Sequence, residues 1–148
     1  SLVDEPGFLI GPDAERAGTI LHGTEAVLAT TESKVPWTTI MIRKSFGVAA
    51  AAHYGPDGYV LAWPSAESGP LPLEGGVAVA FKKEIASAKN PEAKRKELEE
   101  KMAKNQSPFP RAEAFSVHEI IDPRETRKYI ALWAERIQSQ LKASLMNR

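Results

Sequence analysis

The spacing of apolar residues along the chain predicts an α/β fold. From Asp13 to Thr31, apolar or small residues recur every three or four positions, which predicts an amphipathic helix. Short β-branched, apolar runs at 37–42 and 59–63 predict strands that are covered on both faces. Because strand and helix patterns alternate, we expect helices on both faces of a sheet. The positions expected to face inward on the first helix are Ala17, Ile20, Leu21, Thr24, Val27, Leu28 and Thr31.

Residues 74–104 are predicted to form two helices of different character. The first, over 74–88, is modestly amphipathic, and its expected inward positions are Val77, Ala80, Phe81 and Ile85. The second, over 91–104, opens at Asn90, a capping residue followed by proline, and is mostly charged. Because opposite charges stand four residues apart on it, we interpret this charge run as a solvated face rather than a binding patch. The expected pairs are Glu97–Lys101 and Glu100–Lys104.

Three shorter signals complete the predicted order of elements. The apolar pair at 2–3, followed at once by turn residues, predicts the end of another buried strand. Residues 105–115 predict a loop or a short helix, and 117–121 form a short apolar stretch. Residues 122–125 (DPRE) have the form of a capping box, so we expect the last helix to begin there. Its expected apolar stripe, facing this domain or another subunit, is Ile130, Trp133, Ala134, Ile137 and Leu141.

Composition narrows the class of protein without naming an activity. With 148 residues, 43% of them hydrophobic, the chain fits one globular domain with a sizeable core. The 19 basic and 19 acidic residues balance, so no nucleic-acid footprint is indicated. The chain has no cysteine, which excludes disulfides, thiolate metal sites and a cysteine nucleophile. No apolar run has the length of a membrane span, and we expect a cytoplasmic protein that binds neither nucleic acid nor membranes.

Side-chain chemistry offers only weak candidate sites. His22, His53 and His118 lack the spacing of a metal-binding motif, so we expect three structural histidines and no metal. Ser45 does not stand in a G-x-S-x-G nucleophile motif and is interpreted as structural. Gly75 and Gly76 can orient amides toward an anion, but such pairs more often allow close backbone packing.

Gly47 offers a site made of backbone. A glycine between a buried strand and a helix permits a sharp turn, after which the amides of Val48 and Ala49 are unpaired and carry positive dipole character. Such amides stabilise oxyanions, and the small side chains of residues 49–52 let a ligand approach. The alternative is a tight packing turn with no ligand, and composition alone favours it.

Five segments, in order, resemble the C-terminal half of the carboxyltransferase subunit of biotin-dependent acyl-CoA carboxylases, such as the propionyl-CoA and acetyl-CoA carboxylase β subunits. These segments are GFLIGPDAERAGTILHG, SKVPWTTIMIRKSFG, YVLAWPSAE, EGGVAVAFKKEI and AFSVHEIIDPRETR. The resemblance covers nearly the whole chain and implies a crotonase-like ββα-superhelix fold of α/β class. It further implies that residues 1–148 are a C-terminal carboxyltransferase domain, a fragment lacking the N-terminal half.

The resemblance also implies a reaction and its partners. Carboxyl is transferred from carboxybiotin to the α-carbon of an acyl-CoA, with the biotin ureido group as the base. By position, the amides of Val48 and Ala49 correspond to the family's oxyanion hole for biotin, while Gly47, Ala50 and Ala51 correspond to substrate-binding positions. The biotin is carried on a separate biotin carboxyl carrier protein and charged by a biotin carboxylase. A homo-oligomer is expected, with the acyl-CoA hole in the N-terminal half, so the isolated fragment is expected to be inactive.

Departures from the family pattern keep two alternatives open. Val48 stands where relatives have glycine, and a branched side chain there conflicts with any backbone conformation that only glycine allows. Ala50 replaces a usual aromatic, and SGPLPLEGG replaces a segment that usually carries a Met-Gly step. One alternative is the carboxyltransferase of a biotin-dependent decarboxylase. The other is a non-catalytic scaffold that kept the fold. In each case we expect exposed apolar surface where the missing half would sit.

Overall fold

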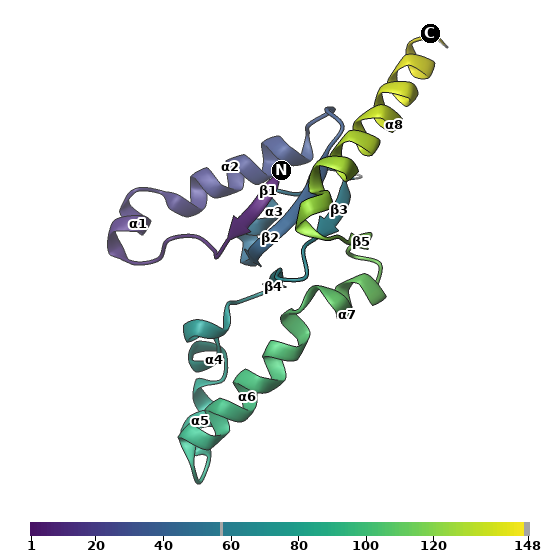
Figure 1. Ribbon diagram of the computed structural model, residues 1–148. Helices are drawn as coiled ribbons and strands as arrows, with labels where there is room; N and C mark the ends of the chain where they lie inside the picture. The colour runs from purple at the N-terminus through teal and green to yellow at the C-terminus, as the bar shows by residue number, and fades with distance from the viewer. Residues whose placement is uncertain (57, 147–148) are drawn as a thin grey trace.

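A parallel sheet organises the computed structural model, which describes residues 1–56 and 58–146 (Figure 1). The strands are β1 (Leu2–Glu5), β2 (Thr38–Phe46), β3 (Tyr59–Ala62), β4 (Glu67–Gly69) and β5 (Glu119–Ile120). Their order is β1-β2-β3-β5, and β4 also pairs with β2. Every one of these pairings is parallel, and at least one helix lies between the two strands of each pair along the chain, so the predicted α/β class is confirmed.

Strand β2 is longer than the pattern of apolar residues predicts. The apolar run at 37–42 forms its first part, but the strand continues through the polar stretch to Phe46. This extension has partners on both sides, because Ser45 is in register with Glu5 of β1 and with Ser68 of β4. Pairing between strands distant in sequence therefore holds the polar residues in extended conformation, where a local pattern indicates a loop.

The core lies on both faces of the sheet. Ile40 and Met41 are adjacent in β2 and point to opposite faces, and both are almost fully buried. Met41 belongs to a cluster with Val60, Ala62, Ala66 and Val117, against which Tyr54 and Ala112 pack. Ile40 belongs to a second cluster with Leu61 and Ile121, against which Tyr59, Trp63 and Tyr129 pack. The prediction of strands covered on both faces is confirmed.

The first predicted helix is divided and largely exposed. It consists of α1 (Pro12–Arg16) and α2 (Thr19–Thr31), separated at Gly18, which has the left-handed φ of 71°. Of the residues in α2 only Gly23 is buried, and the ring of Phe8 lies where a side chain on Gly23 would be. The prediction that this helix buries its apolar face is therefore wrong for this chain on its own. Its large apolar side chains, Ile20, Leu21 and Leu28, are 56–61% exposed.

Four helices lie between β4 and β5, and the first three extend away from the sheet (Figure 1). They are α4 (Leu73–Ala80), α5 (Lys82–Ser87), α6 (Pro91–Gln106) and α7 (Pro108–Glu113). The single helix predicted over 74–88 is wrong, because the backbone leaves helical geometry at Phe81 (φ −112°, ψ 22°). Val77 is buried as predicted, whereas Ala80 is exposed.

Helix α6 begins where the sequence places it. The side chain of Asn90 accepts a hydrogen bond from the amide of Ala93 at 3.1 Å, which confirms the predicted cap. The ion pairs on α6 differ from those expected at Glu97–Lys101 and Glu100–Lys104. They are Lys94–Glu97 at 3.0 Å and Arg95–Glu99 at 2.7 Å, and Lys94 also reaches Glu84 of α5 at 3.2 Å. Most charged residues of α6 are exposed, in agreement with the interpretation of this charge run as a solvated face.

The chain ends in a short 3₁₀ turn, η1 (Pro123–Glu125), and the long helix α8 (Thr126–Met146). Thr126 joins α8 to the sheet, because its hydroxyl accepts a hydrogen bond from the indole of Trp63 at 2.9 Å. Further along α8, the predicted stripe is only partly covered, because Ile130 and Leu141 are exposed whereas Trp133, Ala134 and Ile137 are half-buried. Among residues 1–56 and 58–146, no helix is both long and apolar enough to cross a membrane.

Candidate functional site

Helix α3 (Gly47–Ala51) begins directly where β2 ends. The turn requires glycine, because Gly47 has a φ of 65°, in the left-handed region that side chains disfavour. The carbonyl oxygen of Pro70, in the loop after β4, lies 3.5 Å from the position that a Cβ on Gly47 would occupy. The chain therefore turns sharply from strand to helix beside this loop, at the carboxyl end of β2.

The first turn of α3 presents the two predicted amides. The amides of Val48 and Ala49 have no acceptor within a helix this near its start, and Phe46, the N-cap residue of α3, makes no side-chain cap hydrogen bond. The side chain of Val48 is 62% exposed. Val48 is helical, and the positive φ falls on Gly47 instead. The expected conflict between a branched residue and a glycine-only conformation is therefore absent at Val48.

The alanines of α3 divide between its two faces. Ala49 and Ala50 are buried, at 3% and 5% exposure, and anchor the helix against the domain. Ala51 is exposed. The five predicted site residues are consecutive and make up α3. The side chains of Val48 and Ala51 are accessible, whereas that of Ala50 is covered.

The turn directly after α3 is held by side-chain donors from α2, from β2 and from Trp37, which precedes β2. The carbonyl of Ala52, the C-cap of α3, accepts a hydrogen bond from the hydroxyl of Thr30 at 3.0 Å. The carbonyl of His53 accepts two, from Trp37 Nε1 at 2.9 Å and from Thr39 Oγ1 at 2.8 Å. These contacts fix the chain that leaves α3 to its surroundings.

The turn after α3 fits closely against the same tryptophan. A Cβ on Gly55 would lie 2.4 Å from Cβ and Cγ of Trp37, closer than such atoms approach. Nearby, the hydroxyl groups of Ser45 and Tyr54 lie 2.8 Å apart, and Ser45 is buried. Ser45 therefore has a structural contact, in agreement with its interpretation.

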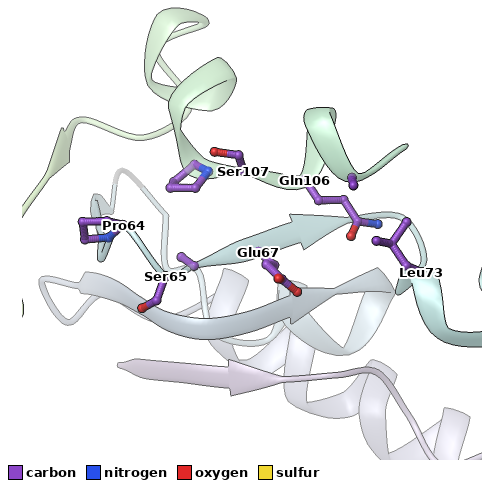
Figure 2. A pocket seen from close by; sticks show the side chains of 9 residues that line it. Pro64, Ser65, Glu67, Leu73, Gln106 and Ser107 are labelled. Atoms are coloured by element: carbon purple, nitrogen blue, oxygen red, sulfur yellow. The ribbon is translucent and has the colours of Figure 1, made fainter. Parts of the chain in front are cut away.

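The loop beside Gly47 is supported by a side chain of helix α6. Figure 2 shows Gln106 at the end of α6, above β4 and next to Leu73. Gln106 is 4% exposed, and its Nε2 donates a hydrogen bond to the carbonyl of Leu71 at 2.9 Å. A cavity of about 210 Å³ lies beside this contact, lined by Pro64, Ser65, Ala66, Glu67, Leu73, Ala103, Gln106, Ser107 and Pro108. The residues that replace the family's Met-Gly segment are thus fixed by a side chain far along the sequence.

The histidines have separate partners. His22 Nδ1 lies 3.2 Å from a carboxylate oxygen of Glu25, and His53 Nδ1 lies 3.1 Å from the hydroxyl of Ser1. His118 Nδ1 accepts a hydrogen bond from the amide of Val60 at 3.0 Å. In the described ranges, no three side chains of histidine, aspartate or glutamate come together as a metal site would require.

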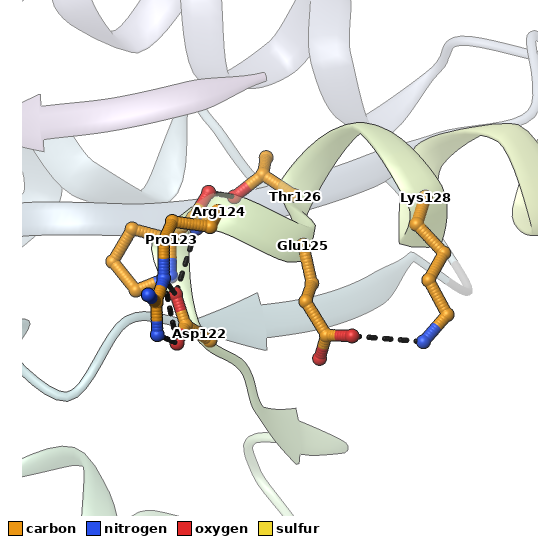
Figure 3. Close-up of polar contacts among 6 residues, drawn as sticks. All are labelled: Asp122, Pro123, Arg124, Glu125, Thr126 and Lys128. Carbon is orange, nitrogen blue, oxygen red and sulfur yellow. Dashed lines mark hydrogen bonds and ion pairs between the residues drawn. The ribbon is translucent and has the colours of Figure 1, made fainter.

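The largest pKa shifts belong to residues outside α3. Arg124 lowers the pKa of Asp122 to about 2 through side-chain and backbone hydrogen bonds (Figure 3). Asp122 caps η1, but Glu125 bonds to Lys128 at 2.9 Å, so the predicted capping box is only half formed. Burial, followed by a hydrogen bond to Glu119, raises the pKa of Tyr59 to about 12. Neither shift bears on Val48 or Ala49.

Sequence reasoning missed the residues that position α3. Thr39 and Trp37 stand in the segment SKVPWTTIMIRKSFG, where they contribute to the apolar pattern of a strand. A hydroxyl in the middle of a buried strand was the available signal, because a buried donor requires an acceptor. Gln106 gave no such signal, since its partner at Leu71 is distant in sequence.

Comparison with known proteins identifies the family of this arrangement. The chain matches the carboxyl transferase domain over residues 1–147. It is 40% identical over 134 residues to the methylmalonyl-CoA carboxyltransferase 12S subunit of Propionibacterium freudenreichii subsp. shermanii, covering 88% of this chain and 26% of that protein. It is 35% identical over 148 residues to the propionyl-CoA carboxylase carboxyltransferase subunit of Haloferax mediterranei, covering 97% and 28%.

The fold leads to the same family. The crystal structure of transcarboxylase 12S, described as a hexamer with methylmalonyl-coenzyme A and methylmalonic acid bound, aligns with a TM-score of 0.81 at 39% identity. The alignment covers 93% of this chain and 27% of that one. The predicted resemblance and its crotonase-like fold are confirmed, and the chain spans about a quarter of the length of these relatives. The chain belongs to the carboxyl transferase domain family.

Proposed function

We propose that this chain provides the biotin side of a carboxyltransferase site, in which the amides of Val48 and Ala49 bind the ureido oxygen of biotin. The observation that carries the proposal is the start of α3, where a left-handed Gly47 is followed by two first-turn amides without a side-chain cap. Hydrogen-bond donors fixed before the reaction stabilise developing negative charge without reorganisation.

The residues present are compatible with such a group. The hole consists of neutral donors, which suit an oxygen that gains negative charge. When bound, carboxybiotin supplies the carboxyl group and its ureido nitrogen supplies the base. Gly47 permits the turn that places both amides at the start of α3, and the buried Ala49 and Ala50 seat the helix that carries them. The exposed side chains of Val48 and Ala51 border the same turn, so we propose that they limit which ligands fit.

An amide NMR titration of the 148-residue chain with biocytin tests this proposal. We expect saturable shifts centred on Gly47, Val48 and Ala49, with lysine as the control ligand that lacks the ureido ring. Shifts spread evenly over the domain, or equal shifts with lysine, would contradict it. A folded chain whose three amides do not respond would favour the scaffold alternative.

For the complete subunit we propose a substrate of the methylmalonyl-CoA and propionyl-CoA class. The support is that the two curated relatives carry these substrates in their names. The assay is carboxyl transfer from methylmalonyl-CoA to biocytin by the complete subunit, compared with malonyl-CoA. Methylmalonyl-CoA is expected to be the better donor. Failure with every malonyl-type CoA would favour the scaffold.

The remaining expectations follow from this proposal. We propose three partners for this chain: the N-terminal half, which would bind the acyl-CoA, the biotin carrier protein, and the biotin carboxylase. The proposed assembly is a homo-oligomer. The fragment alone is expected to show no turnover, and the cytoplasmic location stays a prediction. A decarboxylase carboxyltransferase would use the same site in reverse, and the neighbouring subunits would distinguish it.

A further inference from the structure

We propose that Thr39 is a positioning residue, which sets the direction of the Val48 and Ala49 amides by holding the turn that directly follows α3. This inference rests on the proposed role of those two amides toward biotin, and it names a side chain that aims them. Thr39 lies on β2, seven residues before the end of the strand at Phe46.

Helix α3 is too short to set its own direction. It has five residues, and helices of this length are unstable without tertiary contacts. Its amino end is fixed by the covalent connection from Phe46 through Gly47. The buried Ala49 and Ala50 seat the helix, and a further fixed point after its last residue sets where the first-turn amides point. The hydrogen bonds to the carbonyls of Ala52 and His53 provide it.

Among the three donors at this further point, Thr39 is the most constrained. Its side chain is fully buried, at 0% exposure, and its hydroxyl donates to the carbonyl of His53 at 2.8 Å. The hydroxyl of Thr30 is shared with the carbonyl of Ala26 at 2.9 Å, so its bond to α3 is not exclusive. Because Thr39 and Phe46 belong to one strand, β2 holds both the start of α3 and the turn directly after it.

The chain contains a matched control in the neighbouring residue. Thr38 Oγ1 donates to the carbonyl of Tyr59 at 2.8 Å, which is the same kind of bond from the same strand to β3 instead of the turn after α3. Thr38→Val and Thr39→Val therefore each remove one hydrogen-bonding hydroxyl from β2, but only Thr39→Val removes a contact to the turn after α3. Thr39→Ser keeps the hydroxyl and removes only a methyl group.

The first measurement is the amide NMR spectrum of each variant of the 148-residue chain without ligand, and the second is biocytin affinity. We expect Thr39→Val to shift the Val48 and Ala49 amides and to weaken biocytin binding about threefold to tenfold, the loss of one hydrogen bond. Thr39→Ser restores both. Thr38→Val leaves the two amides and the affinity unchanged, although it also lowers thermal stability.

The inference is overturned if Thr39→Val leaves the Val48 and Ala49 amides in place, or if Thr38→Val moves them equally. Should Thr39→Val not fold, Thr39→Ala removes the same hydroxyl with a smaller side chain, and unmoved Val48 and Ala49 amides in that variant overturn the inference as well. If the unmodified chain does not bind biocytin while Thr39→Val still moves the amides, the positioning role is supported and the proposed biotin role fails.

Discussion

Helix α2 has thirteen residues and helix α3 has five, yet the shorter helix is the more firmly held within this chain. Two of the five residues of α3 are buried, and side chains from two elements bond to its carboxyl end. In α2 only Gly23 is buried, and Ile20, Leu21 and Leu28 face solvent. Helical periodicity in the sequence thus indicates that one face of a helix is apolar. Whether that face is buried depends on tertiary contacts, which the periodicity does not show.

The exposed apolar residues extend beyond α2. Leu9 and Ile10, in the segment before α1, are 79% and 89% exposed. The sequence-based expectation of exposed apolar surface is confirmed for these residues. That another part of a complete subunit covers them stays a prediction, in keeping with a chain that spans about a quarter of its relatives.

The largest expected effect separates the core from the exposed face of α2. Leu61→Ala removes a side chain that is 1% exposed at the centre of the sheet, and we expect a loss of about 2–5 kcal/mol in the free energy of unfolding. Leu28→Ala, at 57% exposure, should change it by less than about 0.5 kcal/mol. Urea denaturation of both variants gives the comparison. A similar loss in both would show that α2 is covered in solution.

A second substitution tests how tightly the surroundings of α3 are packed. Gly55→Ala places a methyl group against the ring base of Trp37, and we expect a loss of about 1–3 kcal/mol from overpacking. The control is Gly69→Ala, whose new methyl group would meet Phe46 at an ordinary 3.5 Å. Thermal unfolding of the two variants is the measurement. Equal stability of both would mean that Trp37 moves aside at little cost.

A third substitution addresses the turn itself. Gly47→Ala puts a side chain in left-handed backbone conformation, for which we expect a cost of about 1–2 kcal/mol. Biocytin-induced shifts at Val48 and Ala49 should weaken in the same variant. The informative control is Val48→Gly, which restores the relatives' residue and should keep those shifts. Unchanged binding in Gly47→Ala would separate the turn from the proposed hole.

The smallest expected effect concerns a surface contact, at the start of α8. The pKa of Asp122 is lowered from 3.8 to about 2 in the folded protein, so its stabilising contribution is present above pH 3.8 and is lost as the pH falls through about 2. Asp122→Asn should therefore lower the melting temperature slightly at neutral pH, and the difference should vanish near pH 2. A difference that persists at that pH would point to the cap alone rather than to the charge.

The sequence predicted those elements that local signals define. Asn90 caps α6, and the apolar run at 59–63 forms β3, because capping and periodicity depend on neighbouring residues. The continuation of β2 to Phe46 and the bond from Gln106 to Leu71 were not predictable, since their partners lie far along the chain. At the candidate site, the glycine turn was predicted from the strand-to-helix pattern, whereas the role of the Val48 and Ala49 amides came from the resemblance to the carboxyltransferase family and stays a prediction. The anchors Trp37 and Thr39 became visible only once α3 had a position in space.

The parallel sheet also constrains when the domain can fold during synthesis. Two parallel strands cannot be joined by a tight hairpin, and each pair here waits for a crossover to be completed. Strand β3 pairs with β5 only when Glu119 and Ile120 have emerged from the ribosome, after all of helices α4 to α7. Until then Leu61 has one edge of its strand open, so the growing chain carries an incomplete sheet edge to which another strand can add.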